Sequence, residues 1–274
     1  ANTNANLGGD GTTNVSHTQT GTPAGVLIFT IEAGNSGNSS VTSVTYGGTT
    51  VPAVSGAFAQ DTGGEAGSTK AWFLGGTTTI PSGNQTVSVA RTGTTNASVV
   101  ICTVTVGSGN KATVGSNANS IVLLEENGAL SVQTVGSDAN ALDAIRYVGL
   151  FSGRGAFGQD TNTRVFVETD NTTDLYQRDL GARLIGAARE TTAGTGNRTV
   201  GYVCTRGDDR AVVHICIQEE QGPLGFTAVK GTFTFTGNDA TFAIGKNLSA
   251  DVLALSVTGN DATFSLGFNV HVDP

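Results

Sequence analysis

The sequence predicts an all-β protein, with a large β-sandwich of jelly-roll-like type followed by a small antiparallel β-meander. Gly accounts for 39 of the 274 residues, about twice its average usage, and it has no Gly-X-Y period. Short apolar and β-branched runs alternate with clusters of Gly, Asn, Ser and Thr, as in strands joined by tight turns. These two observations define the fold class.

Eleven runs have the composition and alternation of β-strands. They span residues 26–32, 41–46, 70–74, 85–91, 98–106, 120–124, 129–135, 145–151, 164–168, 198–204 and 211–218. This number of short strands is typical of a sandwich or jelly roll. Only the segment from Asp174 to Ala188 has a composition compatible with a helix, and Gly181 and Gly186 weaken it, so we expect little helix.

The composition changes after the segment "EEQGPLG", residues 219–225. We therefore predict two domains, a sandwich at residues 1–220 and a repeat meander at residues 221–274. Residues 1–14 form a polar N-terminal arm with almost no apolar side chains of its own. We expect a partner to order this arm, because it cannot bury enough apolar surface to fold alone.

The heptad "TGNDATF" occurs at residues 236–242 and again, 22 residues later, at 258–264. Two-residue turns centred on the Asn-Asp pairs would place Phe235 opposite Phe242 and Val257 opposite Phe264. In that register one face of a four-stranded sheet is apolar. The predicted interaction residues on this face are Phe233, Phe235, Phe242, Ile244, Leu253, Leu255, Val257, Phe264, Leu266 and Phe268. Because such a face needs a cover, we expect it to dock on another surface.

Charge and hydropathy exclude two classes of partner. The chain carries 14 basic and 22 acidic residues, a formal charge of −8, so we expect no binding to nucleic acid, which requires clustered Lys and Arg. No window approaches the roughly 18–20 apolar residues that a bilayer-spanning helix needs, so we expect no membrane partner.

The three cysteines, Cys102, Cys204 and Cys216, all lie in apolar strand-like runs. Their odd number and position predict buried, free thiols, since Cys packs as a small hydrophobe. A disulfide between two of them stays open if their strands are neighbours. No Cys-x-x-Cys spacing indicates a metal site.

Candidate catalytic and cofactor motifs are weak throughout. His214 alternates with apolar residues within a strand, which favours a core or interface role over catalysis, and His17 and His271 lie near the ends of the chain. The Gly-rich segment 152–159 does not open a helix after a βαβ pattern, so we interpret it as a loop and not as a nucleotide site. The "RGD" of residues 206–208 has the composition of a hairpin turn. We therefore assign no catalytic residue and no cofactor.

One acidic stretch could supply oxygen ligands to a metal ion. Asp160, Asn162, Asp170 and Asp174 are weak Ca²⁺ candidates, because oxygen-rich loops suit this ion. The EF-hand spacing is missing, however, and such loops are ordinary in acidic β proteins.

Several motifs resemble an all-β domain of tailed-phage virion proteins and bacterial surface proteins. They are Tyr46-Gly47-Gly48, then Trp72 and Leu74, then Ser82-Gly83 followed by Val87 and Val89. The resemblance covers residues 12–220 and ends in the strand "AVVHICIQE". It implies a structural or adhesive role and supplies no catalytic residues.

From this resemblance we expect a non-enzymatic virion protein, with a capsid decoration or cement protein as the leading role. Its partners would be the major capsid protein or other virion proteins, together with further copies of the chain in a symmetric array. A tail or fibre component is the alternative within this class. A carbohydrate-binding or adhesive surface module is a second class. The small number of aromatic side chains that could stack on sugars, one Trp and four Tyr, argues against it. A glycan depolymerase with paired carboxylates is the third.

Overall fold

The computed structural model describes residues 2–19, 21–34, 39–63, 66–125, 128–153, 167–168, 172–180, 183–221, 233–235, 242–243, 255–257 and 264–265. Every regular element among them is a strand, which confirms the all-β class. Within these ranges, no helix is long and apolar enough to cross a membrane. The chain divides into two compact units, Ala1–Pro223 and Leu224–Pro274.

The first half of the larger unit is a jelly roll. Its strands are β1 (Asn2–Leu7), β2 (Gly11–Gln19), β3 (Gly25–Ala33), β4 (Val41–Tyr46), β5 (Thr49–Thr50), β6 (Ala53–Asp61), β7 (Gly67–Leu74), β8 (Gly83–Arg91) and β9 (Asn96–Val104). They form one sheet in the order β1-β9-β3-β7-β6 and another in the order β2-β8-β4-β5. With β6 as an additional edge strand, the other eight strands alternate between two sheets as in a jelly roll, which confirms that part of the prediction.

The second half repeats this topology. Its strands are β10 (Lys111–Val114), β11 (Ile121–Glu125), β12 (Gly128–Gly136), β13 (Asp143–Gly153), β14 (Val167–Glu168), β15 (Thr172–Asp179), β16 (Arg183–Glu190), β17 (Asn197–Asp208) and β18 (Arg210–Glu220). The order β11-β18-β13-β16-β15 matches β1-β9-β3-β7-β6, and β12-β17-β14 matches β2-β8-β4. The short strand β10 pairs further along β18. The predicted single sandwich is therefore a tandem pair of jelly rolls, the second without a counterpart of β5 among its described strands.

A short sequence similarity supports the equivalence of the two halves. "GNQTV" at residues 83–87 opens β8, and "GNRTV" at residues 196–200 covers the last residue before β17 and its first four residues. Gly83 and Gly196 have φ values of 79° and 82°, the left-handed region in which Gly is favoured. Val87 and Val200 are both fully buried. The same turn and the same core position thus recur in both jelly rolls.

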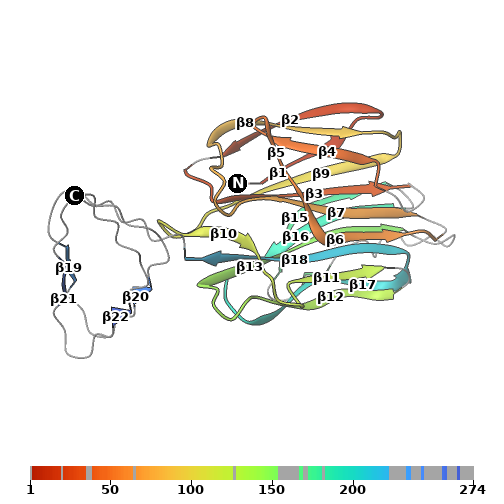
Figure 1. The fold of residues 1–274 in the computed structure, drawn as a ribbon. Coiled ribbons are helices and arrows are strands. Elements are labelled where there is room, and N and C mark those ends of the chain that lie inside the picture. Colours follow the sequence, from red (N-terminus) through yellow and green to blue (C-terminus); the bar gives the residue numbers. More distant parts are fainter. Residues whose placement is uncertain are drawn as a thin grey trace. The chain divides into compact units, whose positions relative to one another are not determined.

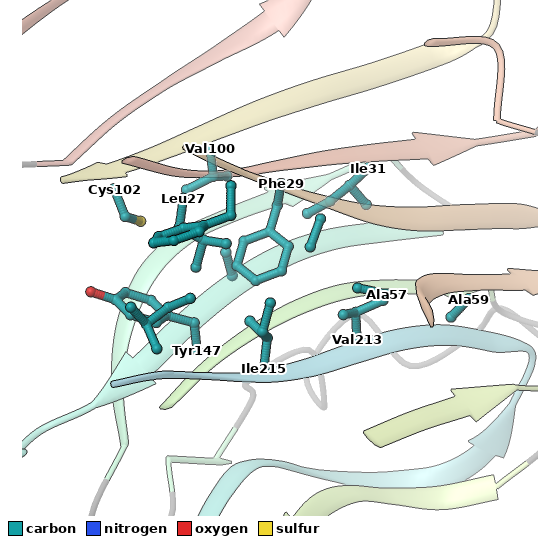
Figure 2. Close-up of a cluster of buried hydrophobic side chains, with 14 of the residues drawn as sticks. Leu27, Phe29, Ile31, Ala57, Ala59, Val100, Cys102, Tyr147, Val213 and Ile215 are labelled. Carbon is teal, nitrogen blue, oxygen red and sulfur yellow. The ribbon is translucent and has the colours of Figure 1, made fainter. Parts of the chain in front are cut away.

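The four sheets lie one above the other (Figure 1). The sheets that contain β3 and β13, here called the inner sheets, face each other. The sheets that contain β8 and β17, here called the outer sheets, cover their other sides. Figure 2 shows Leu27, Phe29 and Val100 of one inner sheet packed against Tyr147 and Ile215 of the other. Because β3 is covered on both faces, all nine of its residues are buried.

Two phenylalanines and two glycines fix how closely the inner sheets approach. A Cβ atom on Gly149 would lie 2.5 Å from the ring of Phe29, and a Cβ atom on Gly67 would overlap the ring of Phe151. Each jelly roll therefore contributes one ring and one glycine to the contact. Nearby, the Thr69 hydroxyl donates a hydrogen bond of 2.7 Å to the Ala211 carbonyl across the two halves.

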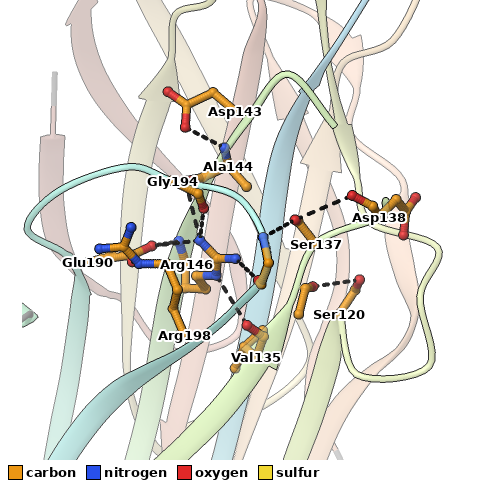
Figure 3. Close-up of polar contacts among 12 residues, drawn as sticks. Ser120, Val135, Ser137, Asp138, Asp143, Ala144, Arg146, Glu190, Gly194 and Arg198 are labelled. Atoms are coloured by element: carbon orange, nitrogen blue, oxygen red, sulfur yellow. Dashed lines mark hydrogen bonds and ion pairs between the residues drawn. The ribbon is translucent and has the colours of Figure 1, made fainter. Parts of the chain in front are cut away.

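A buried ion network holds one end of the second jelly roll (Figure 3). Arg146 and Glu190 have fully buried side chains, and Nη1 of Arg146 lies 3.1 Å from Oε2 of Glu190. Arg146 also donates to the carbonyls of Val135, Gly194 and Gly196. Since Gly194 and Gly196 lie in the loop between β16 and β17 and Val135 lies in β12, the guanidinium ties that loop and β12 to β13.

The first jelly roll has its own buried cation and anion. Arg91 donates to the carbonyls of Gly8 and Thr95, both at 2.9 Å, and to the Ser40 hydroxyl at 3.1 Å. The Glu32 carboxylate accepts from the backbone N–H of Ser40 at 3.0 Å. Both charged groups are thus satisfied by loop atoms at one end of the sheets, as buried charges require.

The prediction of an N-terminal arm that needs a partner is wrong, whereas the expectation of little helix is confirmed. Residues 2–7 of the supposed N-terminal arm form β1, which pairs with β9 of the same chain, and residues 11–14 begin β2. Backbone hydrogen bonds to an apolar neighbouring strand therefore order this polar segment without a partner. The segment that was compatible with a helix, Asp174–Ala188, supplies parts of the antiparallel strands β15 and β16. The glycines at 181 and 186 had already argued against a helix.

The predicted antiparallel register of the repeat is also wrong. β19 (Phe233–Phe235) pairs in parallel with β21 (Leu255–Val257), and β20 (Phe242–Ala243) pairs in parallel with β22 (Phe264–Ser265). Phe235 is therefore opposite Val257 and not opposite Phe242. Every described pair joins residues 22 positions apart, so equivalent strands of successive repeats pair with each other.

Two of the three predicted buried thiols are confirmed. Cys102 and Cys216 are free and buried, and burial raises the pKa of each thiol to about 12. They face different layers, since Cys102 packs between the inner sheets and Cys216 packs toward an outer sheet. Cys204 lies in β17, and the surroundings of its side chain are outside the described residues.

The Phe29 contact predicts a large effect of a small substitution. We expect Gly149→Ala to lower the free energy of unfolding by about 1–3 kcal/mol, because its Cβ atom would overpack the interface between the inner sheets. Gly9→Ala is the matched control, since its nearest neighbour would lie 4.0 Å away, and we expect a change within about 0.5 kcal/mol. Urea denaturation measures both. Equal effects of the two substitutions would contradict this packing.

The buried and the partly exposed ion pair should differ in how much they stabilise the fold. Glu190→Gln should lower the free energy of unfolding by about 3–5 kcal/mol, because it leaves the buried Arg146 guanidinium without its counterion. Lys111 and Glu220 form a pair of 3.0 Å whose side chains are 31% and 25% exposed. Lys111→Gln should therefore cost less than about 1 kcal/mol. Thermal and urea unfolding of both variants would test this, and a small loss for Glu190→Gln would refute the role of the network.

Cys102 and Cys216 should react slowly with thiol reagents in the native protein. At pH 8 we expect Cys102 and Cys216 to remain unmodified by a thiol reagent, because each is buried and is overwhelmingly in the unreactive thiol form. Both should react after denaturation. Mass spectrometry of peptides assigns the modified positions, and rapid native labelling of either cysteine would contradict the core positions described above.

Candidate functional site

A pocket of about 150 Å³ lies at one end of the contact between the inner sheets. One side comes from the end of β9 and the residues that follow it, Thr103–Val106. The other side comes from β13, β16 and β18. Thr105 is exposed, so the pocket is accessible at this rim. Its deeper wall continues the apolar cluster between the inner sheets through Val104 and Ile217.

Strand register brings the important side chains of the pocket together. Asp143, Ile145 and Tyr147 alternate along β13, so they share the face that points toward the first jelly roll. Tyr147 is directly opposite Arg189 of β16, and Asp143 is directly opposite Glu219 of β18. Directly opposed residues lie on the same face. The pocket therefore has a cation beside a phenol, and two carboxylates four residues further along β13, at a backbone separation of about 13 Å.

Arg189 is the least satisfied group in the pocket. Its Nε atom is buried and has no hydrogen-bond partner within the described part of the chain. Burial raises the pKa of the neighbouring Tyr147, and the charge of Arg189 opposes that shift only in part. Tyr147 is consequently a neutral phenol. Figure 2 shows its hydroxyl directed away from Phe29 and Ile215.

The two carboxylates are only partly occupied. Oδ1 of Asp143 accepts from the N–H of Ala144 at 2.8 Å, and Oε1 of Glu219 accepts from the N–H of Gly107 at 3.0 Å. Asn110 also donates to the same Glu219 oxygen. The second oxygen of each carboxylate is available to a ligand. The site thus offers donors at Arg189 and acceptors at Asp143 and Glu219, at two separate positions of its lining with the apolar Ile145 between them.

The predicted interaction residues fall into two groups. Phe233, Phe235, Phe242, Leu255, Val257 and Phe264 lie in the four paired strands of the repeat. Ile244, Leu253, Leu266 and Phe268 lie outside the described residues. The structure brings the first group together in two parallel ladders and not in the one antiparallel sheet that we predicted.

The calcium candidates are not brought together in the described part of the chain. Asp174 lies in β15, opposite Ala188. Asp160, Asn162 and Asp170 are outside the described residues. Across the described ranges, no group of three or more His, Cys, Asp or Glu is placed to hold a metal ion.

Two histidines lie inside the body. His214 is fully buried in β18, opposite Val148, where the first jelly roll has Ile101 opposite Ile28. This position fits the core role predicted for it. His17 is also fully buried, and its Nδ1 lies 2.8 Å from the Thr3 hydroxyl. Burial lowers the pKa of His17, which favours the neutral ring. Its polar sequence neighbours gave no sign of this burial.

Sequence reasoning missed the pocket entirely. Arg189 directly follows the segment that was compatible with a helix, and Asp143 precedes a predicted strand. One signal was available, since the strand "RLIGAARE" has charged residues at both ends of an apolar centre and Arg189 is one of them. The neighbours that give it meaning come from three other strands, and only the fold brings them together.

Comparison with known proteins adds no relative from which a role could be transferred. No protein-family model, no curated protein and no solved structure matches the chain.

Proposed function

We propose that this chain is a non-enzymatic structural protein of a phage virion, most consistent with a capsid decoration or cement protein. It would bind the major capsid protein or other virion proteins and further copies of itself, in a virion that assembles in the host cytoplasm. The observation that carries the proposal is the parallel, in-register pairing of the 22-residue repeat.

The pairing supplies a physical route to self-association. Within the described residues, each of the four repeat strands pairs with one other strand, so each ladder has two outer edges there. A further copy of the same repeat matches such an edge residue by residue, because equivalent positions already pair at a constant spacing. A second copy of the chain carries such a repeat. Assembly of many copies would extend the ladders that begin with Phe242 opposite Phe264.

The body supports the same role by analogy. Jelly rolls occur in viral capsid proteins, and they also occur in lectins, so this argument rests on fold alone. The paired jelly rolls bury two layers of sheet between two others, and they lock their ends with buried ion networks. A rigid pair of jelly rolls of this kind suits a protein that must keep its shape on the surface of a particle. The motifs around Tyr46, Trp72 and Ser82 point to the same class of protein.

Removal of the repeat tests the proposal. A chain that ends at Gln221 should remain folded and monomeric but should lose its place in particles assembled in its presence. A full-length control with residues 226–272 in scrambled order keeps composition and length but loses the 22-residue spacing, and it should fail in the same way. Particle occupancy would be measured by gel band and cryo-EM density, and mass photometry would give the oligomeric state. Full occupancy of the truncated chain would refute the assembly role.

A further inference from the structure

The pocket between the inner sheets has the size of one six-membered ring. Its volume of about 150 Å³ equals that of an engineered protein cavity that binds benzene. A ring that entered from the rim at Thr105 would meet apolar side chains on its deeper side, namely Val104, Ile145 and Ile217. Concave sites with an apolar wall and a few convergent polar groups are typical of ligand-binding sites.

The polar groups of the pocket match hydroxyls better than they match an ion. Arg189 supplies only donors, whereas the free oxygens of Asp143 and Glu219 supply only acceptors. A hydroxyl both donates and accepts, so hydroxyls on opposite sides of one ring could bond to the guanidinium and to a carboxylate. The buried Nε of Arg189, which has no partner among the described residues, would gain one.

Charge argues against a simple anion in the same place. The pocket lining includes one cation, Arg189, and two carboxylates, Asp143 and Glu219, so its formal charge is negative. An anion in the pocket would gain the guanidinium but would be repelled by the excess carboxylate charge of the lining. A neutral, hydroxyl-rich ring avoids this repulsion. Its C–H face would lie on Ile145, Ile217 and the ring of Tyr147, as sugars do on apolar and aromatic side chains.

We therefore propose that this pocket binds a single neutral sugar ring, with Arg189 and Asp143 hydrogen-bonding its hydroxyls against the wall formed by Ile145 and Ile217. This inference does not depend on the proposed assembly role. The site lies wholly in the tandem jelly rolls, whereas the assembly role rests on the repeat. The expected affinity is in the millimolar range, because few atoms of a monosaccharide make contact.

Methyl NMR of the full-length chain tests the proposal directly. With Ile methyl groups labelled, the protein would be titrated separately with glucose, galactose, mannose and N-acetylglucosamine. We expect at least one of these sugars to shift the signals of Ile145 and Ile217 in a saturable way, while Ile28 and Ile101, which pack toward the first outer sheet, stay unchanged. No saturable shift with any of the four sugars would overturn the proposal.

Substitutions then assign the contacts. Arg189→Met and Asp143→Ala should each weaken the binding of that sugar about tenfold or more, since each removes hydrogen bonds to a charged group. Asp10→Ala is the matched control, because Asp10 is exposed in the turn between β1 and β2, and it should leave binding unchanged. If Arg189→Met does not fold, the half-buried Asp143 decides alone. Unchanged binding by Asp143→Ala would refute the site.

Two further probes separate a sugar from an ion. Sodium acetate carries only a carboxylate, and glycine carries a carboxylate and an ammonium group. Neither should shift Ile145 or Ile217 at concentrations that saturate the sugar effect. Shifts with acetate or glycine in the absence of any sugar effect would overturn the assignment of a neutral sugar. A truncated chain that ends at Gln221 should bind the sugar as the full-length chain does, which separates this site from the assembly role.

Discussion

Because the two inner sheets are covered on both faces, their central strands must be apolar on both sides and must also fit each other closely. β3 is buried along its whole length, and only Thr30 and Glu32 among its nine residues are polar. The pairing of Phe29 with Gly149 and of Phe151 with Gly67 meets the second, since neither glycine has space for a side chain. A ring that fills the space above a glycine leaves no cavity and needs no unusual rotamer. The order of the layers and the position of the pocket both depend on this contact.

The same burial explains where the charged residues are found. Charges cannot be left unpaired in the inner layers, so Arg146, Glu190, Arg91 and Glu32 lie where loops can supply hydrogen-bonding partners. Each network joins a strand to loops at the ends of the sheets and closes the sandwich there. The pocket lies at an end where closure is incomplete. There Arg189 has a buried Nε atom without a partner among the described residues, which a water molecule or a ligand hydroxyl would complete.

Sequence reasoning could predict the strands that make their own apolar signal. All eleven predicted runs overlap strands, from β3 to β18. Strands such as β1, "NTNANL", could not be found in this way, because their order comes from pairing with β9 and not from their own side chains. Two further features could be read from the sequence. The continuous apolar run in β3 indicated a strand that is covered on both faces, and the similarity of residues 83–87 to residues 196–200 indicated a duplication. The pocket was not predictable, since its residues meet only after β9, β13, β16 and β18 have assembled.

The repeat shows how one pattern can fit two topologies. Alternating apolar residues on both sides of an Asn-Asp pair are compatible with a hairpin and equally with strands stacked on the next repeat, because both expose one face with a period of two. Spacing decides between them. A hairpin pairs residues within one copy, whereas identical residues at a constant spacing of 22 align when successive copies lie parallel, as Phe242 and Phe264 do. In such a ladder each repeat is a neighbour to the next, and stability grows with the number of stacked repeats. The proposed addition of further copies therefore rests on the repeat and not on the jelly rolls.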